Sequence, residues 1–186
     1  MNEISIKPSQ QGQLDNLCGV YSVVNVVAFL YKDKPHFKRR ALMNALLKAY
    51  AEWGPLEDMV TAGLDTWEMD MLLNLVMERG YFHQKYPITI SKPFLKDRNL
   101  NVQEVLIRIR RYVGRSNSKT VRVVLIGTTI HWSVIHAVDA QFVYFFDSTG
   151  DQQARLSAFT FKHSNRKRVL HKESIYYIQR TKEGEL

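Results

Sequence analysis

The order of hydrophobic patterns along the chain is the feature that most limits its fold. Up to about residue 115 the apolar residues recur at helical spacing, and from about residue 120 they form short runs typical of strands. Helices that precede strands favour an α+β fold, in which helices pack against an antiparallel sheet. The 186 residues suit a single domain. We divide it into a helical lobe over about 14–115 and a sheet lobe over about 120–182.

Local signals give the expected elements. The spacing predicts helices over about 16–31, 37–53, 66–79 and 101–113. The third helix begins after the capping residue Asp65 and stops at Gly80, and the fourth opens with the capping-box pair Asn101 and Glu104. The apolar runs predict strands over about 86–91, 121–126, 130–138, 141–147 and 174–180.

The first expected helix is apolar almost all round, which predicts that it is buried. Three polar residues, Cys18, Ser22 and Asn25, recur at i, i+4 and i+7 and therefore form one stripe along it. Buried polar groups need partners, so this stripe requires an explanation in the fold. Asp15 or Asn16 is the candidate capping residue in front of the helix.

Cys18 is the only cysteine, which excludes an internal disulfide and a cysteine-rich zinc site. A lone cysteine is either a core residue or a reactive thiol. The N-terminus of a buried helix favours the reactive thiol, because the helix dipole and free N–H groups stabilise a thiolate. Gly19 leaves room for a substrate carbonyl beside the sulfur. The amide of Gln13, or alternatively of Gln11, together with the backbone N–H of Cys18, would bind an oxyanion.

A general base and a residue that orients it would complete this chemistry. Among six histidines, His131 is the candidate base, because it follows the turn-like residues 127–129 and opens an apolar strand. His136, five residues later, points to the other face of that strand. Asp147 ends the run QFVYFFD, where a carboxylate is costly without a partner, and is the candidate orienting acid. Its alternative interpretation is a turn residue, since DSTGD is also typical of turns.

Strand geometry tests the pairing of His131 with Asp147. Side chains alternate between faces, so these two share a face only if the connection near Asp139-Ala140 is odd in length or a β-bulge shifts the register. We predict such an odd loop or a bulge. With a three-residue loop at 138–140, His131 lies directly opposite Asp147. A regular two-residue turn would place them on opposite faces.

Together these residues resemble a known family. A glutamine, four residues, a Cys-Gly pair with Ser and Asn on the same helix, and then the distant blocks HWSV and FDS are similar to the papain-like cysteine peptidase clan. The likeness is to C39-like peptidases, Josephin-type deubiquitinases and bacterial effector proteases and deamidases. It implies a papain-like fold with a thiol-bearing helical lobe on an antiparallel sheet. It assigns the oxyanion amide to Gln13, the nucleophile to Cys18, the base to His131 and the orienting acid to Asp147. No aromatic residue follows the Cys-Gly pair, unlike in papain's own subfamily.

The expected function is a cysteine hydrolase, a thiol protease that cleaves amide bonds of a protein substrate through a thioester, as a peptidase or isopeptidase. The same triad would serve a protein glutamine deamidase, and the sequence does not choose between them. Two alternatives are a non-catalytic basic module that binds nucleic acid or protein, and a pseudoenzyme that keeps the fold as a docking surface. No cofactor and no metal are implied.

The net charge of +8 favours an acidic partner. Residues 108–115, RIRRYVGR, and 162–172, KHSNRKRVLHK, carry much of this charge. Neither an aromatic RNA-binding motif nor a helix-turn-helix accompanies them, so nucleic acid is the less favoured partner. The apolar stretch Val20–Leu30 is too short to span a bilayer, and the N-terminus lacks a signal-peptide core. We expect a cytoplasmic protein, with signal-peptide-independent delivery as an effector as the alternative; the oligomeric state is not indicated.

Overall fold

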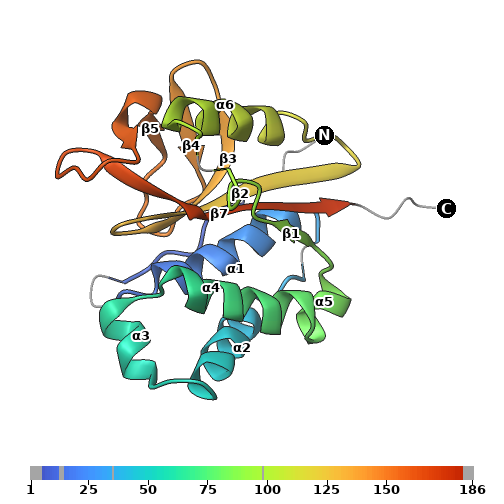
Figure 1. The fold of residues 1–186 in the computed structure, drawn as a ribbon. Helices are drawn as coiled ribbons and strands as arrows, with labels where there is room; N and C mark the ends of the chain where they lie inside the picture. The colour runs from blue at the N-terminus through green and yellow to red at the C-terminus, as the bar shows by residue number, and fades with distance from the viewer. Residues whose placement is uncertain (1–5, 13–14, 35, 98, 182–186) are drawn as a thin grey trace.

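An antiparallel sheet with helices on both faces forms the fold (Figure 1). The structure, a computed structural model, describes residues 6–12, 15–34, 36–97 and 99–181. The helical elements are α1 (Cys18–Leu30), α2 (Arg39–Ala51), α3 (Leu56–Ala62), α4 (Thr66–Leu72), the π-helical η1 (Leu73–Glu78), α5 (Tyr81–Lys85), α6 (Val102–Val113) and the 3-10 turn η2 (Leu156–Ala158). The strands are β1 (Thr89–Ser91), β2 (Thr120–Thr128), β3 (Trp132–Val138), β4 (Phe142–Phe145), β5 (Gln153–Arg155), β6 (Phe159–Thr160) and β7 (Arg168–Thr181).

The sheet runs in the order β1-β7-β2-β3-β4-β5, and each neighbouring pair along this path is antiparallel. The short strand β6 pairs with β7 in parallel. Helices followed by an antiparallel sheet confirm the expected α+β class.

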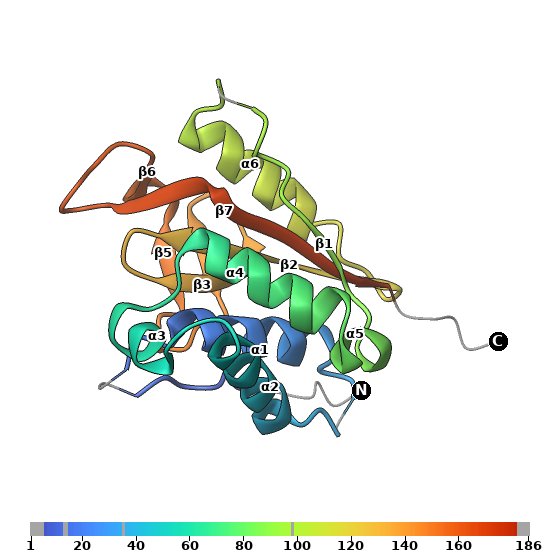
Figure 2. The same cartoon turned by 60° about the horizontal axis from the view of Figure 1, so that its bottom comes forward.

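Two hydrophobic clusters lie on opposite faces of the sheet. Along β2, Val123 and Leu125 belong to the cluster under the N-terminal helices, while Val124 and Ile126 belong to the cluster under α6. This alternation is what a strand buried on both faces requires. Two elements within residues 14–115 therefore lie outside the helical layer: β1 is an edge strand, and α6 covers the opposite face (Figures 1 and 2).

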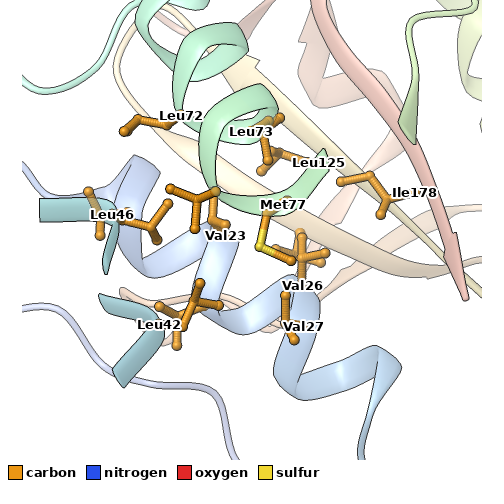
Figure 3. Close-up of a cluster of buried hydrophobic side chains, with 14 of the residues drawn as sticks. Val23, Val26, Val27, Leu42, Leu46, Leu72, Leu73, Met77, Leu125 and Ile178 are labelled. Carbon is orange, nitrogen blue, oxygen red and sulfur yellow. The ribbon is translucent and has the colours of Figure 1, made fainter. Parts of the chain in front are cut away.

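Helix α1 lies between the sheet and the outer helices, which confirms that it is buried (Figure 3). Its valines meet side chains from α2, from α4 with η1, and from the sheet. The residues labelled in that cluster are Val23, Val26, Val27, Leu42, Leu46, Leu72, Leu73, Met77, Leu125 and Ile178. A helix enclosed in this way has its position and rotation set by packing.

The capping residues predicted for α4 and α6 are confirmed, whereas several short helices and strands were not predicted. The predicted cap Asp65 is present at the start of α4, where it also forms a capping box with Glu68, and the predicted capping box of Asn101 and Glu104 is present at the start of α6. The helix expected over 66–79 changes to π-helical bonding at Leu73. The sequence did not predict α3, α5, β5 or β6, since each is too short to show a period.

Truncating a side chain in this cluster should show that it supports the fold. Leu46→Ala should lower the free energy of unfolding by about 2–5 kcal/mol, because it leaves a cavity in a fully buried site. The matched control is Leu75→Ala, at a leucine that is 43% exposed, which should cost about 0.5 kcal/mol or less. Urea unfolding of both variants measures the difference, and equal losses would contradict this description of the core.

Candidate active site

Cys18 is the first residue of α1 and is 8% exposed. The expected cap by Asp15 or Asn16 is wrong: the N-cap residue is Leu17, and no described side chain caps the helix. Asp15 instead accepts a hydrogen bond from the N–H of Leu17, and the Asn16 amide donates to the carbonyl of Thr61. The first N–H groups of α1 therefore have no side-chain acceptor among the described residues.

The polar stripe of α1 is explained by its partners. The Ser22 hydroxyl donates to the carbonyl of Trp132 at 2.9 Å, inside the core. Asn25 accepts from the N–H of Ser9 at 2.7 Å and donates to its carbonyl at 3.2 Å. These bonds join α1 to β3 and to the N-terminal segment. Cys18, one turn before Ser22, therefore faces the start of β3.

His131 enters the site from a tight turn before β3. The Thr128 hydroxyl donates to the His131 carbonyl at 2.9 Å and accepts from its N–H at 3.1 Å. On the other side, the Trp132 indole donates to the carbonyl of Leu64 at 2.8 Å. Its ring lies so close to Gly127 that a Cβ there would be 2.9 Å away. The backbone of His131 and the neighbouring Trp132 are therefore held in place.

The His131 imidazole meets the carboxylate of Asp147. Its Nε2 lies 3.0 Å from Oδ1 and 3.1 Å from Oδ2, and the Asp147 side chain is fully buried. The N–H and hydroxyl of Thr149 each donate to Oδ1 at 2.8 Å, and the Ser133 hydroxyl also hydrogen-bonds the carboxylate. A buried carboxylate needs such a set of donors. The turn interpretation also holds, since Thr149 N–H to Asp147 is an Asx-turn.

A β-bulge brings His131 and Asp147 to the same face, which confirms the predicted register shift. Near the connection, Val138 pairs with Val143, but Ile135 pairs with Phe145, so the register shifts between Ile135 and Ala137. The connection itself is not the three-residue loop considered at 138–140. Asp139 N–H donates to the Phe142 carbonyl across a two-residue turn, and the bulge corrects the parity.

The Cys18 sulfur and the Asp147 carboxylate both raise the pKa of the His131 imidazole. Burial lowers the pKa of His131, but hydrogen bonds and charge from Asp147 and Cys18 outweigh it and raise that pKa to about 9. Burial raises the pKa of Asp147, whereas its hydrogen bonds to His131, Ser133 and Thr149 lower it to about 2. Because Nε2 faces Asp147, Nδ1 is the ring nitrogen left for the thiol. At neutral pH this environment favours imidazolium beside carboxylate.

Neither glutamine amide that was predicted to bind the oxyanion is confirmed. Gln13 lies outside the described residues. The Gln11 amide donates to the carbonyl of Asp15, so this donor already has a partner in the structure. Gly19 also has a packing role: a Cβ there would lie 2.9 Å from Leu64 and 3.1 Å from Met69, so its lack of a side chain lets α1 pack closely.

Three of the other histidines contact groups other than Asp147. His136, at the bulge, packs against Phe29 of α1 with ring centroids 5.2 Å apart. His83 contacts the carbonyl of Met77, and His171 contacts Thr129. Sequence reasoning missed Thr128, Ser133 and Thr149 as supports of the site. Ser133 and Thr149 each lie two residues beyond His131 and Asp147, a spacing that could have revealed them.

Comparisons with known proteins identified no relative of this chain. A scan against family models, a search of curated proteins and a search of solved structures each found no match. The papain-like resemblance therefore stays a prediction. Within the described ranges, no helix has the length and apolar character needed to cross a membrane. Nor does any group of three or more His, Cys, Asp or Glu side chains in those ranges form a potential metal site.

The His131–Asp147 pair predicts a specific pH dependence of stability. The pKa of His131 is raised from 6.5 to about 9, so its contribution to the stability of the folded protein is complete below pH 6.5 and is lost as pH rises through about 9. The pKa of Asp147 is lowered from 3.8 to about 2, so its contribution is lost as pH falls through about 2. The free energy of unfolding of the native protein should therefore exceed that of Asp147→Asn by the largest amount between pH 3.8 and 6.5. Urea unfolding across pH measures it, and an advantage unchanged up to pH 10 would contradict the pairing.

Proposed function

We propose that this protein is a cysteine hydrolase in which Cys18 is the nucleophile, His131 the general base and Asp147 the orienting acid. The observation that supports it most is an imidazole that hydrogen-bonds a fully buried carboxylate and whose pKa is raised by both that carboxylate and the Cys18 thiol. A core cysteine has no need of an imidazole, and a turn aspartate has no need of one either. A nucleophile beside a base, with the base hydrogen-bonded to an orienting group, is the arrangement of covalent hydrolases.

In the proposed reaction, His131 holds the proton of Cys18 and the sulfur attacks an amide carbonyl, forming an S–C bond. The oxyanion lies against the backbone N–H at the start of α1. His131 then gives its proton to the leaving amine as the C–N bond breaks. Water attacks the thioester, its proton passes to His131, and the S–C bond breaks to release the acid and restore the thiol.

The shape around His131 supports a protein substrate. One pocket of about 550 Å³ is bordered by Leu64, Trp132 and Ser174, and another of about 800 Å³ by His131 and Thr149. Thr129 lines both pockets, so the turn that carries His131 lies between them. A surface hollowed on both sides of the base suits an extended chain that crosses the site.

Alkylation of the thiol tests whether it is activated. At neutral pH, iodoacetamide should modify Cys18 about tenfold faster than free cysteine, which is only a few per cent thiolate at that pH. His131→Ala should remove this advantage, because it removes the proton acceptor. The matched control is His36→Ala, at an exposed histidine, which should leave the rate unchanged. A Cys18 that reacts no faster than free cysteine, with or without His131, would refute the proposed nucleophile.

Product analysis distinguishes the possible reactions. A cell extract treated with the native protein should gain cleaved peptide or isopeptide bonds that are absent after treatment with Cys18→Ala. Asp147→Asn should slow this cleavage by about 10²–10⁴-fold, since it removes the charge that orients and stabilises the imidazolium. Mass spectrometry of new termini measures the cleavage. Conversion of glutamine to glutamate without new termini would assign the site to a deamidase, and no Cys18-dependent change would favour a docking protein.

A further inference from the structure

The second basic segment of the sequence forms one wall of the larger pocket beside His131. The loop between β6 and β7, with the first residue of β7, contributes residues 163–168, and His131, Ile130 and Thr149 line the same pocket. The loop and the first turn of α1 lie at the same end of the molecule, away from the C-terminus (Figures 1 and 2). We name this pocket the basic groove.

Two cations of the basic groove are available to a ligand. Arg166 and Lys167 are exposed, and neither forms an ion pair within the described part of the chain. The hydroxyl of Ser164 accepts from the N–H groups of both residues, at 3.2 and 3.1 Å, and so gives the loop a defined turn. Arg168 differs, because it pairs with Asp151 and lies over the Phe145 ring.

The pocket on the other side of the turn has the opposite charge. Among the described residues that line it, four are carboxylates and none is lysine or arginine. These are Asp58, Asp65, Glu68 and Glu173. The basic groove is lined by three Lys or Arg residues and one aspartate. The two sides of His131 therefore attract segments of opposite charge, and an acidic segment is favoured on one side only.

The other basic segment, 108–115, does not contribute to this site. It belongs mainly to α6, which covers the opposite face of the sheet from α1 (Figure 1). Arg108 there is already close to Asp97, at 3.6 Å. The local charge at residues 163–168, rather than the net charge of the chain, is therefore what a substrate at His131 would meet.

We propose that the basic groove binds an acidic segment of the protein substrate, close to the amide bond that is hydrolysed. The assignment rests on the proposed function and names the substrate class of that site. Arg166 and Lys167 contact the carboxylates of the segment. Ile130, next to His131 and 86% exposed, offers an apolar contact to a substrate side chain at the rim.

A binding assay with the full-length protein tests this proposal separately from catalysis. The probe is a fluorescent hexaglutamate peptide, with hexalysine and a single-stranded oligonucleotide as comparison ligands, followed by anisotropy. Arg166→Glu combined with Lys167→Glu should weaken hexaglutamate binding by about tenfold, the size expected when two exposed ion pairs are reversed. Binding should also weaken as salt rises. The matched control, Arg110→Glu with Arg111→Glu on α6, makes the same charge change and should leave binding almost unchanged.

A protection measurement places the peptide next to the site. Bound hexaglutamate should slow iodoacetamide modification of Cys18, and the groove variant should lose this protection. Equal loss of binding in both double variants would show attraction to net charge alone and would overturn the proposal. So would tighter, groove-dependent binding of the oligonucleotide than of the peptide. An unactivated Cys18 would refute the hydrolase while leaving the anisotropy result intact, so the two failures are distinguishable.

Discussion

The buried hydrogen bond from the Ser22 hydroxyl to the Trp132 carbonyl is the contact on which the arrangement of this protein depends. It joins the middle of α1 to the first residue of β3 at 2.9 Å. Cys18 lies one turn before Ser22, and His131 lies one residue before Trp132, so this bond, together with packing, links the position of the thiol to that of the imidazole. A buried hydroxyl left without this partner would cost about 1–3 kcal/mol. Sliding or rotating α1 is therefore opposed by both hydrogen bonding and packing.

The buried charge of Asp147 is the second constraint, and the fold meets it with several donors. A carboxylate removed from water is tolerated only when paired and hydrogen-bonded. Here Thr149, Ser133 and His131 supply those bonds. The bulge between Ile135 and Ala137 interrupts a regular ladder to bring them together. A buried ion pair that requires an interruption of regular strand pairing is more typical of a functional site than of a site selected for stability.

Most of the candidate site could be predicted from single residues, and most of its supports could not. Cys18, His131 and Asp147 could be identified because each carries chemistry that its sequence neighbourhood does not explain. Thr128 and Ser133 are ordinary strand and turn residues until the strands pair. The same limit applies to α3 and α5, whose few residues show no period, and to the π-helical change at Leu73, which depends on how α4 packs.

The sequence by itself determined the longer helices and strands and which residues are candidates for the chemistry. Hydrophobic period, capping pairs such as Asn101 with Glu104, and a single thiol at a helix start act within a few residues, so they are readable without coordinates. Only the tertiary structure decided that a bulge rather than an odd loop shifts the β3–β4 register, that α6 lies on the far face, and that Arg166 and Lys167 border the pocket of His131 while 108–115 does not. These outcomes depend on contacts between residues far apart in the chain, where many partners satisfy the same local pattern and packing selects one.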